Sequence, residues 1–326
     1  MLHRFIIAIG AGCAAALLFA VSSQTSPLAM ALAYLAPLPI MIVSLGWGLD
    51  GGALAGAVSV LALALLAGLP TGLLFAASIA SPAWLLAVFS ATPVARYFSR
   101  RPAGAPPYPS VGAVVGLASF IGMALALAAL VAVIAYYGGY SEAAKQIGAS
   151  LATIARSAFE DEAQGAVAAE FANSLVRLAP AAIAASTLLM LCVNLYAAAR
   201  STQMSHSLTR PWPDIPTALH LPWPFAIALM ASAAAAYAVP APASQYALIV
   251  VGGLGGAFVL QGLAVAHALS RGLKLRTVML IALYACCLLR AKYTIPVVAA
   301  LGVADAFVRL RSRAAFVPAP KPTTHK

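Results

Sequence analysis

Long apolar runs, interrupted by short gaps that hold most of the charged residues, constrain this chain more than any other feature of its sequence. Of its 326 residues, 63% are hydrophobic and only 8% are charged, and the mean hydropathy is +0.95. Soluble globular domains contain roughly 25% charged residues. A chain with this pattern is typical of a protein embedded in a lipid bilayer.

The apolar runs have the lengths expected of membrane-spanning helices. A helix that crosses about 30 Å of hydrocarbon needs about 20 largely apolar residues, because its backbone groups must bond within the segment. The sequence therefore predicts an all-α, polytopic bundle of about ten transmembrane helices. Eight is the lower bound, since the third, seventh, ninth and tenth runs are short. The runs are Phe5–Val21, Leu28–Gly46, Gly52–Leu66, Thr71–Thr92, Val111–Tyr137, Leu178–Ala199, Pro224–Val239, Gln245–Leu269, Thr277–Leu289 and Thr294–Val308.

The basic residues predict which ends of these helices face the cytoplasm. Loops rich in Lys and Arg are retained on the cytoplasmic side of a membrane. With Arg4 and the N-terminus inside, most of the 19 basic residues fall in cytoplasmic loops or in the C-terminal tail. We expect both termini in the cytoplasm, with anionic lipid headgroups as partners. Nucleic acid is not an expected partner, because the basic residues are scattered over loop ends.

Two loops are long enough to have structure of their own within a single membrane domain, residues 1–313. The outside segment 138–177 has apolar residues at helical spacing, which predicts one or two amphipathic helices along the membrane surface. The cytoplasmic segment 200–224 alternates prolines with tryptophans and predicts a stiff elbow at headgroup level. Residues 314–326 predict a disordered cytoplasmic tail. Candidate contacts with lipid or a cytoplasmic protein partner are Arg210, Trp212, Asp214, Trp223, Arg309 and Arg311.

Polar residues inside the apolar runs are the candidates for a ligand-facing site, because burying them in lipid is costly. They are Asn194 in the sixth run, Gln261 and His267 in the eighth, and Asp305 in the tenth. Asp305 precedes Arg309 by four residues, so we expect an ion pair on one helix face, with a proton relay as the alternative. His267 lies near the end of its helix, where the helix dipole favours a cation.

Patterns of catalytic or cofactor-binding residues do not occur in the chain. It lacks a Walker motif, a nucleophile elbow and a His-Glu-x-x-His motif. The glycines from Gly252 to Gly256 lie within an apolar run, not after a soluble strand, so they do not predict a dinucleotide site. We therefore expect no enzymatic activity, no cofactor and no metal site.

Three stretches of the chain resemble the YybS-like family of bacterial membrane proteins, a predicted membrane domain of unknown function. The resemblance extends over almost the whole chain and implies a multi-pass protein of the inner membrane of a Gram-negative bacterium. That family is distantly similar to the substrate-binding subunits of energy-coupling-factor transporters, which have six helices and depend on a coupling subunit and ATPases. The stretches are Leu38–Ile40 through Leu45–Gly48, Asn194–Arg200 with Arg210–Asp214, and Leu301–Phe307 closing on Arg309 and Arg311.

Three functions stay open at this point. The leading hypothesis is a non-catalytic component that binds or helps to move a small molecule, with a partner that supplies energy. A membrane scaffold or regulatory protein without a ligand is the alternative, and a proton- or ion-coupled secondary transporter is the second alternative. A partly polar cavity inside the bundle would favour ligand binding, whereas a packed bundle would favour the scaffold.

Overall fold

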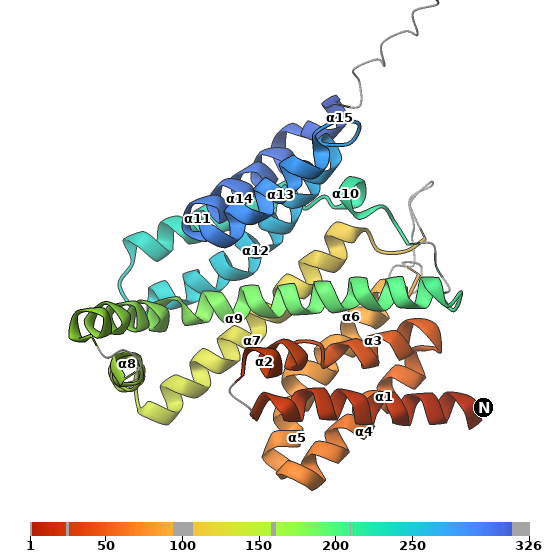
Figure 1. Ribbon diagram of the computed structural model, residues 1–326, viewed down its shortest axis with the longest axis horizontal. Coiled ribbons are helices and arrows are strands. Elements are labelled where there is room, and N and C mark those ends of the chain that lie inside the picture. The colour runs from red at the N-terminus through yellow and green to blue at the C-terminus, as the bar shows by residue number, and fades with distance from the viewer. Residues whose placement is uncertain are drawn as a thin grey trace, which may run out of the picture.

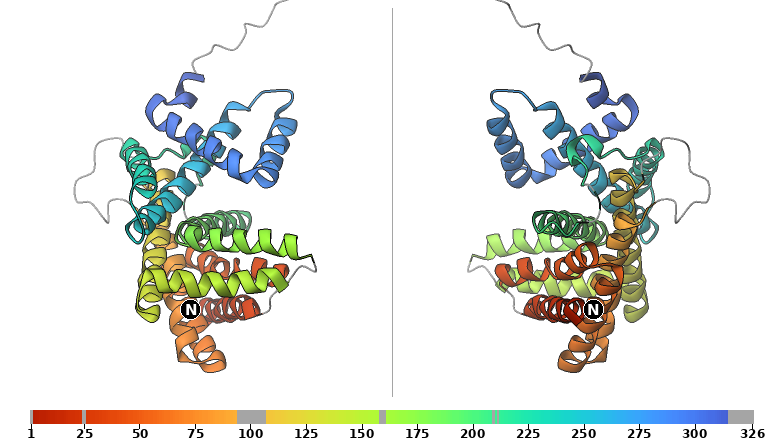
Figure 2. Two further views of the ribbon diagram at one scale, coloured as in Figure 1. Left: turned by 90° about the vertical axis from the view of Figure 1, so that its left-hand side faces the viewer. Right: turned by 90° about the vertical axis from the view of Figure 1, so that its right-hand side faces the viewer.

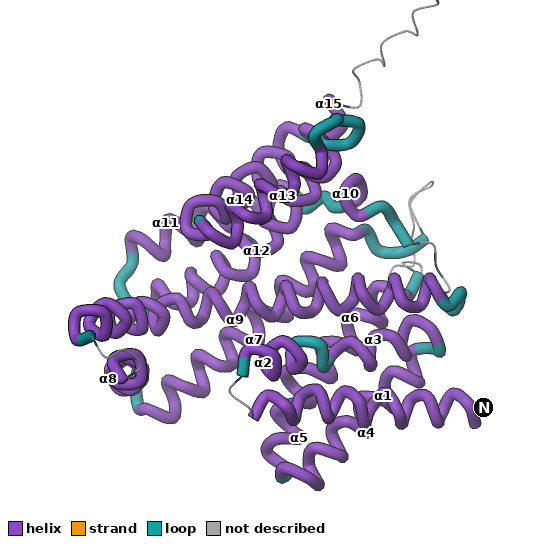
Figure 3. The backbone as a smooth tube through the Cα atoms, in the orientation of Figure 1, coloured by secondary structure: helices purple, strands orange, loops and turns teal. Residues whose placement is uncertain are grey.

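The described part of the chain consists of helices joined by short loops and turns. The computed structural model describes residues 2–23, 26–93, 107–157, 161–208, 210 and 212–314, and the side chains of all of these except 23, 162, 173, 313 and 314. Within these ranges there is no strand (Figure 3). The all-α prediction is confirmed.

The first half of the chain, red to orange in Figure 1, forms one side of the molecule. One expected span is interrupted by a short break between α2 and α3, and another passes without a break from α5 through a π-helical turn into α6. The elements are α1 (Leu2–Ala20), η1 (Val21–Ser23), α2 (Pro27–Ala33), α3 (Pro37–Gly46), α4 (Leu49–Ala67), α5 (Leu69–Phe75), the π-helical turn η2 (Ala76–Ala80) and α6 (Ser81–Ala91).

The second half of the chain packs against the first through α9, which contacts α3, α6, α7, α8 and α12. In Figure 1, α11 to α15 lie on the far side of α9 from α1 and α4. The elements are α7 (Val111–Tyr137), α8 (Tyr140–Ser157), α9 (Glu162–Met204), α10 (Ile215–Ala218), α11 (Trp223–Ala238), α12 (Ala243–Leu269), α13 (Arg276–Leu289), α14 (Ala291–Val308) and α15 (Leu310–Ala314).

All ten predicted spans are helical, and eight of them are long and apolar enough to cross a membrane. The third and tenth predicted spans extend to 19 residues in α4 and 18 residues in α14. The seventh and ninth stay short, with 16 residues in α11 and 14 in α13. Figure 2 shows α13 at the edge of the molecule, and none of its residues is buried. The chain is a multi-pass membrane protein.

The break between α2 and α3 is closed by a side chain from another helix. The amide of Leu38 bonds to the carbonyl oxygen of Leu35, which frees the carbonyl of Tyr34 from the helical pattern. Asn194 of α9, 1% exposed, donates from Nδ2 to that carbonyl oxygen at 2.7 Å. An unpaired carbonyl in hydrocarbon would cost several kcal/mol. Asn194 therefore stabilises a helix break.

The fourth span bends at a proline. Pro82 has no amide hydrogen to donate to the carbonyl of Ser78, one turn earlier. The preceding residues, Ala76–Ala80, form the wider π-helical turn that often accompanies such a missing bond. The helical stretch Leu69–Ala91 thus crosses as one bent span.

The outside segment 138–177 is only partly a separate amphipathic unit. α8 is such a helix, but residues 162–177 continue directly into the sixth span as α9, which is 43 residues long. The membrane-spanning part of α9 starts at Ser174, four residues before the expected Leu178, and Pro180 is accommodated inside the helix. In Figure 1, α8 lies at the left, whereas the start of α1 and the elbow lie at the right.

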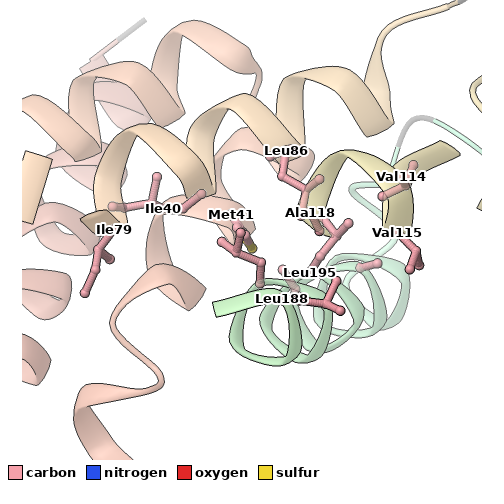
Figure 4. Close-up of a cluster of buried hydrophobic side chains, with 14 of the residues drawn as sticks. Ile40, Met41, Ile79, Leu86, Val114, Val115, Ala118, Leu188 and Leu195 are labelled. Atoms are coloured by element: carbon pink, nitrogen blue, oxygen red, sulfur yellow. The ribbon is translucent and has the colours of Figure 1, made fainter. Parts of the chain in front are cut away.

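A buried hydrophobic cluster joins the two halves of the molecule. Figure 4 shows that it is formed by facing side chains of α3, α6, α7 and α9. Ile40 and Met41 of α3 are fully buried, as is Leu86 of α6. This cluster fixes α9 against the first half of the chain and leaves the opposite face of α9 to α12. The other members labelled in Figure 4 are Ile79, Val114, Val115, Ala118, Leu188 and Leu195.

Glycines allow α12 to approach its neighbours closely. A Cβ at Gly252 would overlap the carbonyl oxygen of Ala181 in α9. At Gly262 it would overlap the carbonyl oxygen of Val298 in α14. Small residues at such crossings let membrane helices pack backbone to backbone. This contact brings the elbow ends of α12 and α14 together.

Replacing Gly262 by alanine should weaken the packing of α12 on α14. The added Cβ requires the two backbones to separate, and overpacking of this kind costs about 1–3 kcal/mol. We expect a lower melting temperature for Gly262→Ala, measured by scanning fluorimetry in a mild detergent.

The matched control is Gly255→Ala on the same helix, where the new Cβ would meet only Leu229 Cδ1 at 3.8 Å. Its melting temperature should equal or slightly exceed that of the wild type, because alanine is the better helix former. An equal loss in the two variants would show that the close contact at Gly262 does not matter.

Candidate functional site

A pocket of about 490 Å³ lies between α7, α9 and α12 and is covered by the elbow; we call it the elbow pocket. Its apolar wall includes Val114 and Val115 of α7, Leu195 of α9, and Leu260 and Leu263 of α12. Small-molecule sites commonly have volumes of roughly 300–1,000 Å³ and largely apolar walls. The elbow pocket has both properties.

The rim of the elbow pocket is open on one side. Val193 and Tyr196 of α9 are each 50% exposed, and Tyr284 of α13 is 43% exposed. On a membrane-embedded bundle such residues face lipid or a neighbouring molecule. The elbow pocket is therefore lined by exposed side chains of α9 and α13 as well as by buried ones.

Arg210 is a positively charged residue of the elbow that lines this pocket. The residue is only 6% exposed, and its Nη1 donates to the carbonyl oxygen of Ser90 at the end of α6. Its guanidinium carbon lies 5.1 Å from the ring centre of Tyr108 and 5.2 Å from that of Trp212. Aromatic faces at such distances attract a desolvated cation. The guanidinium is thus held in one orientation by two rings and one carbonyl.

Two hydrogen-bond donors that belong to pocket residues lack an acceptor. They are Nε of Arg210 and Nε1 of Trp212, both buried. Burial lowers the pKa of Arg210, against a smaller opposing effect of Tyr108. Buried donors are almost always satisfied in proteins. These two buried donors are therefore the most unusual polar feature of the pocket.

His267 is the one sequence candidate for a ligand-facing residue that lines the elbow pocket. Its Nε2 and the hydroxyl of Tyr284 lie 2.8 Å apart, which ties α12 to α13 at the rim. The structure therefore gives His267 a specific partner in addition to its place near a helix end. Tyr284 was not anticipated, because nothing in the sequence pairs two residues on separate helices.

Gln261 and Asp305 form a buried network with Arg311. Asp305 is fully buried, and its Oδ2 accepts from Nη2 of Arg311 at 2.6 Å and from Nε2 of Gln261 at 3.1 Å. The Oε1 of Gln261 accepts from the amide of Leu221 at 2.6 Å, and Nη1 of Arg311 donates to the carbonyl of Pro216 at 2.7 Å. The network joins α12, α14, α15 and the elbow.

The expected partner of Asp305 was wrong. Arg309 adopts a left-handed backbone conformation, with φ of 52°, which ends α14 and turns the chain. The following short helix brings Arg311 back onto Asp305, so the ion pair forms across the turn instead of along one helix face. Residues four positions apart can pair on one face of a continuous helix. Asp305 and Arg309 do not pair in this way because α14 ends at Val308, between them.

The candidates for contact with lipid or a protein partner divide into buried and exposed groups. Arg210 and Arg311 are buried instead of facing headgroups, whereas Trp223 is 56% exposed and Arg309 is also exposed. Asp214 forms a two-fold ion pair with Arg271, with both contacts at 2.7 Å. Lipid or protein contact therefore stays a prediction for the exposed residues.

The Asp214–Arg271 pair lies at the surface. The side chains are 49% and 42% exposed, respectively. Hydrogen bonds from Arg271 and from Thr217 hold the pKa of Asp214 at about 2, well below its ordinary value. A carboxyl group whose pKa is lowered by folding stabilises the folded protein when the pH is above the ordinary pKa of that group. This stabilisation is lost as the pH falls toward 2. Solvent screening keeps it small.

A second pocket, about 690 Å³, lies at the other end of the α9–α12 contact. Tyr140 of α8, Arg177 of α9 and Gln245 of α12 contribute to its lining. The sequence candidates do not include these residues. Gly252 and Gly256 of α12 pack against α9 between the two pockets.

Replacing Asp305 by asparagine should strongly destabilise the elbow end of the bundle. The variant keeps the size of the side chain but leaves Arg311 buried without a counter-charge, and breaking a buried pair in this way costs about 3–5 kcal/mol. We expect a large fall in melting temperature in mild detergent. The double variant Asp305→Asn with Arg311→Gln should recover part of that loss.

Asp214→Asn provides the comparison, because it removes an exposed ion pair at the same end of the molecule. Its melting temperature should change little. If Asp305→Asn and Asp214→Asn behaved alike, the buried network would not hold the elbow in place.

Comparison with known proteins agrees with the architecture described above. Searches of curated proteins and of solved structures give no match. A family model with the description "Predicted membrane protein (DUF2232)" matches residues 13–306, from α1 to α14. The YybS-like resemblance is thereby confirmed at the level of the family, whereas the similarity to energy-coupling-factor subunits stays a hypothesis. The chain belongs to this family of multi-pass membrane proteins, whose function is unknown.

Proposed function

We propose that this protein is a non-catalytic membrane component that binds an apolar or amphipathic small molecule in the elbow pocket. The observation that carries the proposal is the pocket itself, about 490 Å³ of space with largely apolar walls beside a buried arginine. Binding sites for small molecules combine apolar walls with a few polar groups that orient the ligand. A scaffold needs no such space, so the pocket favours binding over the scaffold.

An ion-coupled transporter has weaker support. That alternative depends on Asp305, whose carboxylate lies within the membrane helix α14. Both of its oxygens lie within hydrogen-bond distance of Arg311, and Gln261 also donates to it. A carboxylate that is bound by a buried guanidinium and by an amide is more typical of a structural ion pair than of a proton relay.

The proposal includes an orientation in a bacterial inner membrane. We place the elbow on the cytoplasmic side, because the charge rule assigns most basic loops to that side. Exposed Arg309 and Trp223 would then lie at the level of anionic headgroups. If the distant similarity to energy-coupling-factor subunits extends to function, a separate protein partner supplies the energy for transport.

Native mass spectrometry of the full-length protein, extracted gently from its own membrane, tests the proposal. We expect a small-molecule adduct at one-to-one stoichiometry on the wild type. Leu263→Trp should lose this adduct, because the larger side chain fills the pocket that Leu263 lines.

The matched control is Leu189→Trp on α9, where the leucine is 49% exposed and lies outside the elbow pocket. This variant should keep the adduct, and melting temperatures show that both variants are folded. A wild-type spectrum with lipid in variable amounts and no defined adduct would contradict the proposal. So would an adduct of equal occupancy in Leu263→Trp.

A further inference from the structure

We infer that the ligand of the elbow pocket is an anionic amphiphile, with an apolar chain and a terminal carboxylate or phosphate bound by Arg210 and Trp212. This inference rests on the proposed function and adds the chemical class of the ligand. It depends on three observations: Arg210 is a buried cation without a counter-charge in the described part of the chain, its Nε and Nε1 of Trp212 are unpaired donors, and the rest of the lining is mostly apolar.

The charge of Arg210 has no counter-charge in the described part of the chain. Asp214 is already paired with Arg271, and Asp305 with Arg311. A buried charge is costly unless it is paired and hydrogen-bonded. The contacts with Ser90 and with two aromatic rings orient the guanidinium but carry no negative charge. A bound anion would supply it.

The two unpaired donors indicate where the anion lies. Nε of Arg210 and Nε1 of Trp212 come from residues two positions apart in the elbow, and both residues line the pocket. A carboxylate or phosphate has several acceptor oxygens and can accept from both donors at once. Hydrogen bonds between charged groups are about twice as strong as those between neutral groups.

The rest of the elbow pocket suits the alkyl chain of a ligand better than a second polar group. The lining includes the apolar Val114, Leu260 and Leu263, and it also includes Val193 and Tyr196, which are each 50% exposed. A ligand with its head at Arg210 would therefore bury its apolar chain along α9 and α12. It would enter from the membrane, where amphiphiles are concentrated.

The test compares three probes that share one alkyl chain: laurate, dodecyl phosphate and dodecanol. Tritiated probes are bound to the full-length protein in phosphatidylcholine nanodiscs at neutral pH, with empty nanodiscs as background. We expect at least one anionic probe to bind about tenfold or more tightly than dodecanol, the factor expected of a charged hydrogen bond. Preference for laurate identifies a fatty-acid-like ligand, and preference for dodecyl phosphate identifies a lipid phosphate.

Arg210→Gln should remove the preference for the anion and keep dodecanol binding. Arg200→Gln is the matched control, because Arg200 is exposed on α9 and bonds to Gln203 outside the pocket. That variant should keep the preference. Trp212→Phe, which keeps the ring stacked on Arg210 but removes the donor, should weaken anion binding severalfold.

The outcomes separate the inference from the proposed function. Equal binding of all three probes would overturn the anionic ligand but leave binding in the elbow pocket intact. A preference that survives in Arg210→Gln would overturn the inference as well. If Arg210→Gln fails to fold, an unchanged preference in Trp212→Phe would overturn it. Binding of none of the probes would contradict both the inference and the proposed function.

Discussion

Hydrogen bonding of polar groups inside the membrane is the constraint on which the rest of this structure depends. Hydrocarbon offers no partners, so the chain forms helices, and a carbonyl freed at a helix break needs a partner from within the chain. The carbonyl of Tyr34, freed at the start of α3, accepts from Asn194 more than a hundred positions later. A break that serves to bend one span thus fixes the position of another helix.

The same constraint explains why α12 is central to the second half of the chain. Its glycines remove the side chains that would separate it from α9 and α14, so packing depends on backbone contact. Close approach of α12 and α14 lets Gln261 donate to the carbonyl of Gly302 and to Asp305. Arg311 then connects this pair to the elbow. The elbow is therefore held over the bundle by buried polar contacts as well as by its own prolines.

Two buried arginines in this part of the molecule have opposite surroundings. Arg311 has a carboxylate and two backbone carbonyls as acceptors and acts as a structural lock. Arg210 has one carbonyl and two aromatic rings, but no carboxylate. The charge of Arg311 is neutralised within the chain by Asp305. The charge of Arg210 has no such partner in the described part of the chain, and this difference is the basis of the proposed anionic ligand of the elbow pocket.

The sequence by itself determined the all-α class, the ten apolar helices and the two long loops, because hydrophobic length and charge placement are local properties. It also identified Asn194, Gln261, His267 and Asp305 as residues of interest from their cost in an apolar setting, and Arg210 as part of the elbow. Only the tertiary structure decided their partners. Asp305 pairs with Arg311 and not Arg309 because α14 ends at a left-handed residue, and the pocket arises where residues of α7, α9, α12 and the elbow meet. Such contacts depend on the relative placement of separate helices, which no spacing along the chain records.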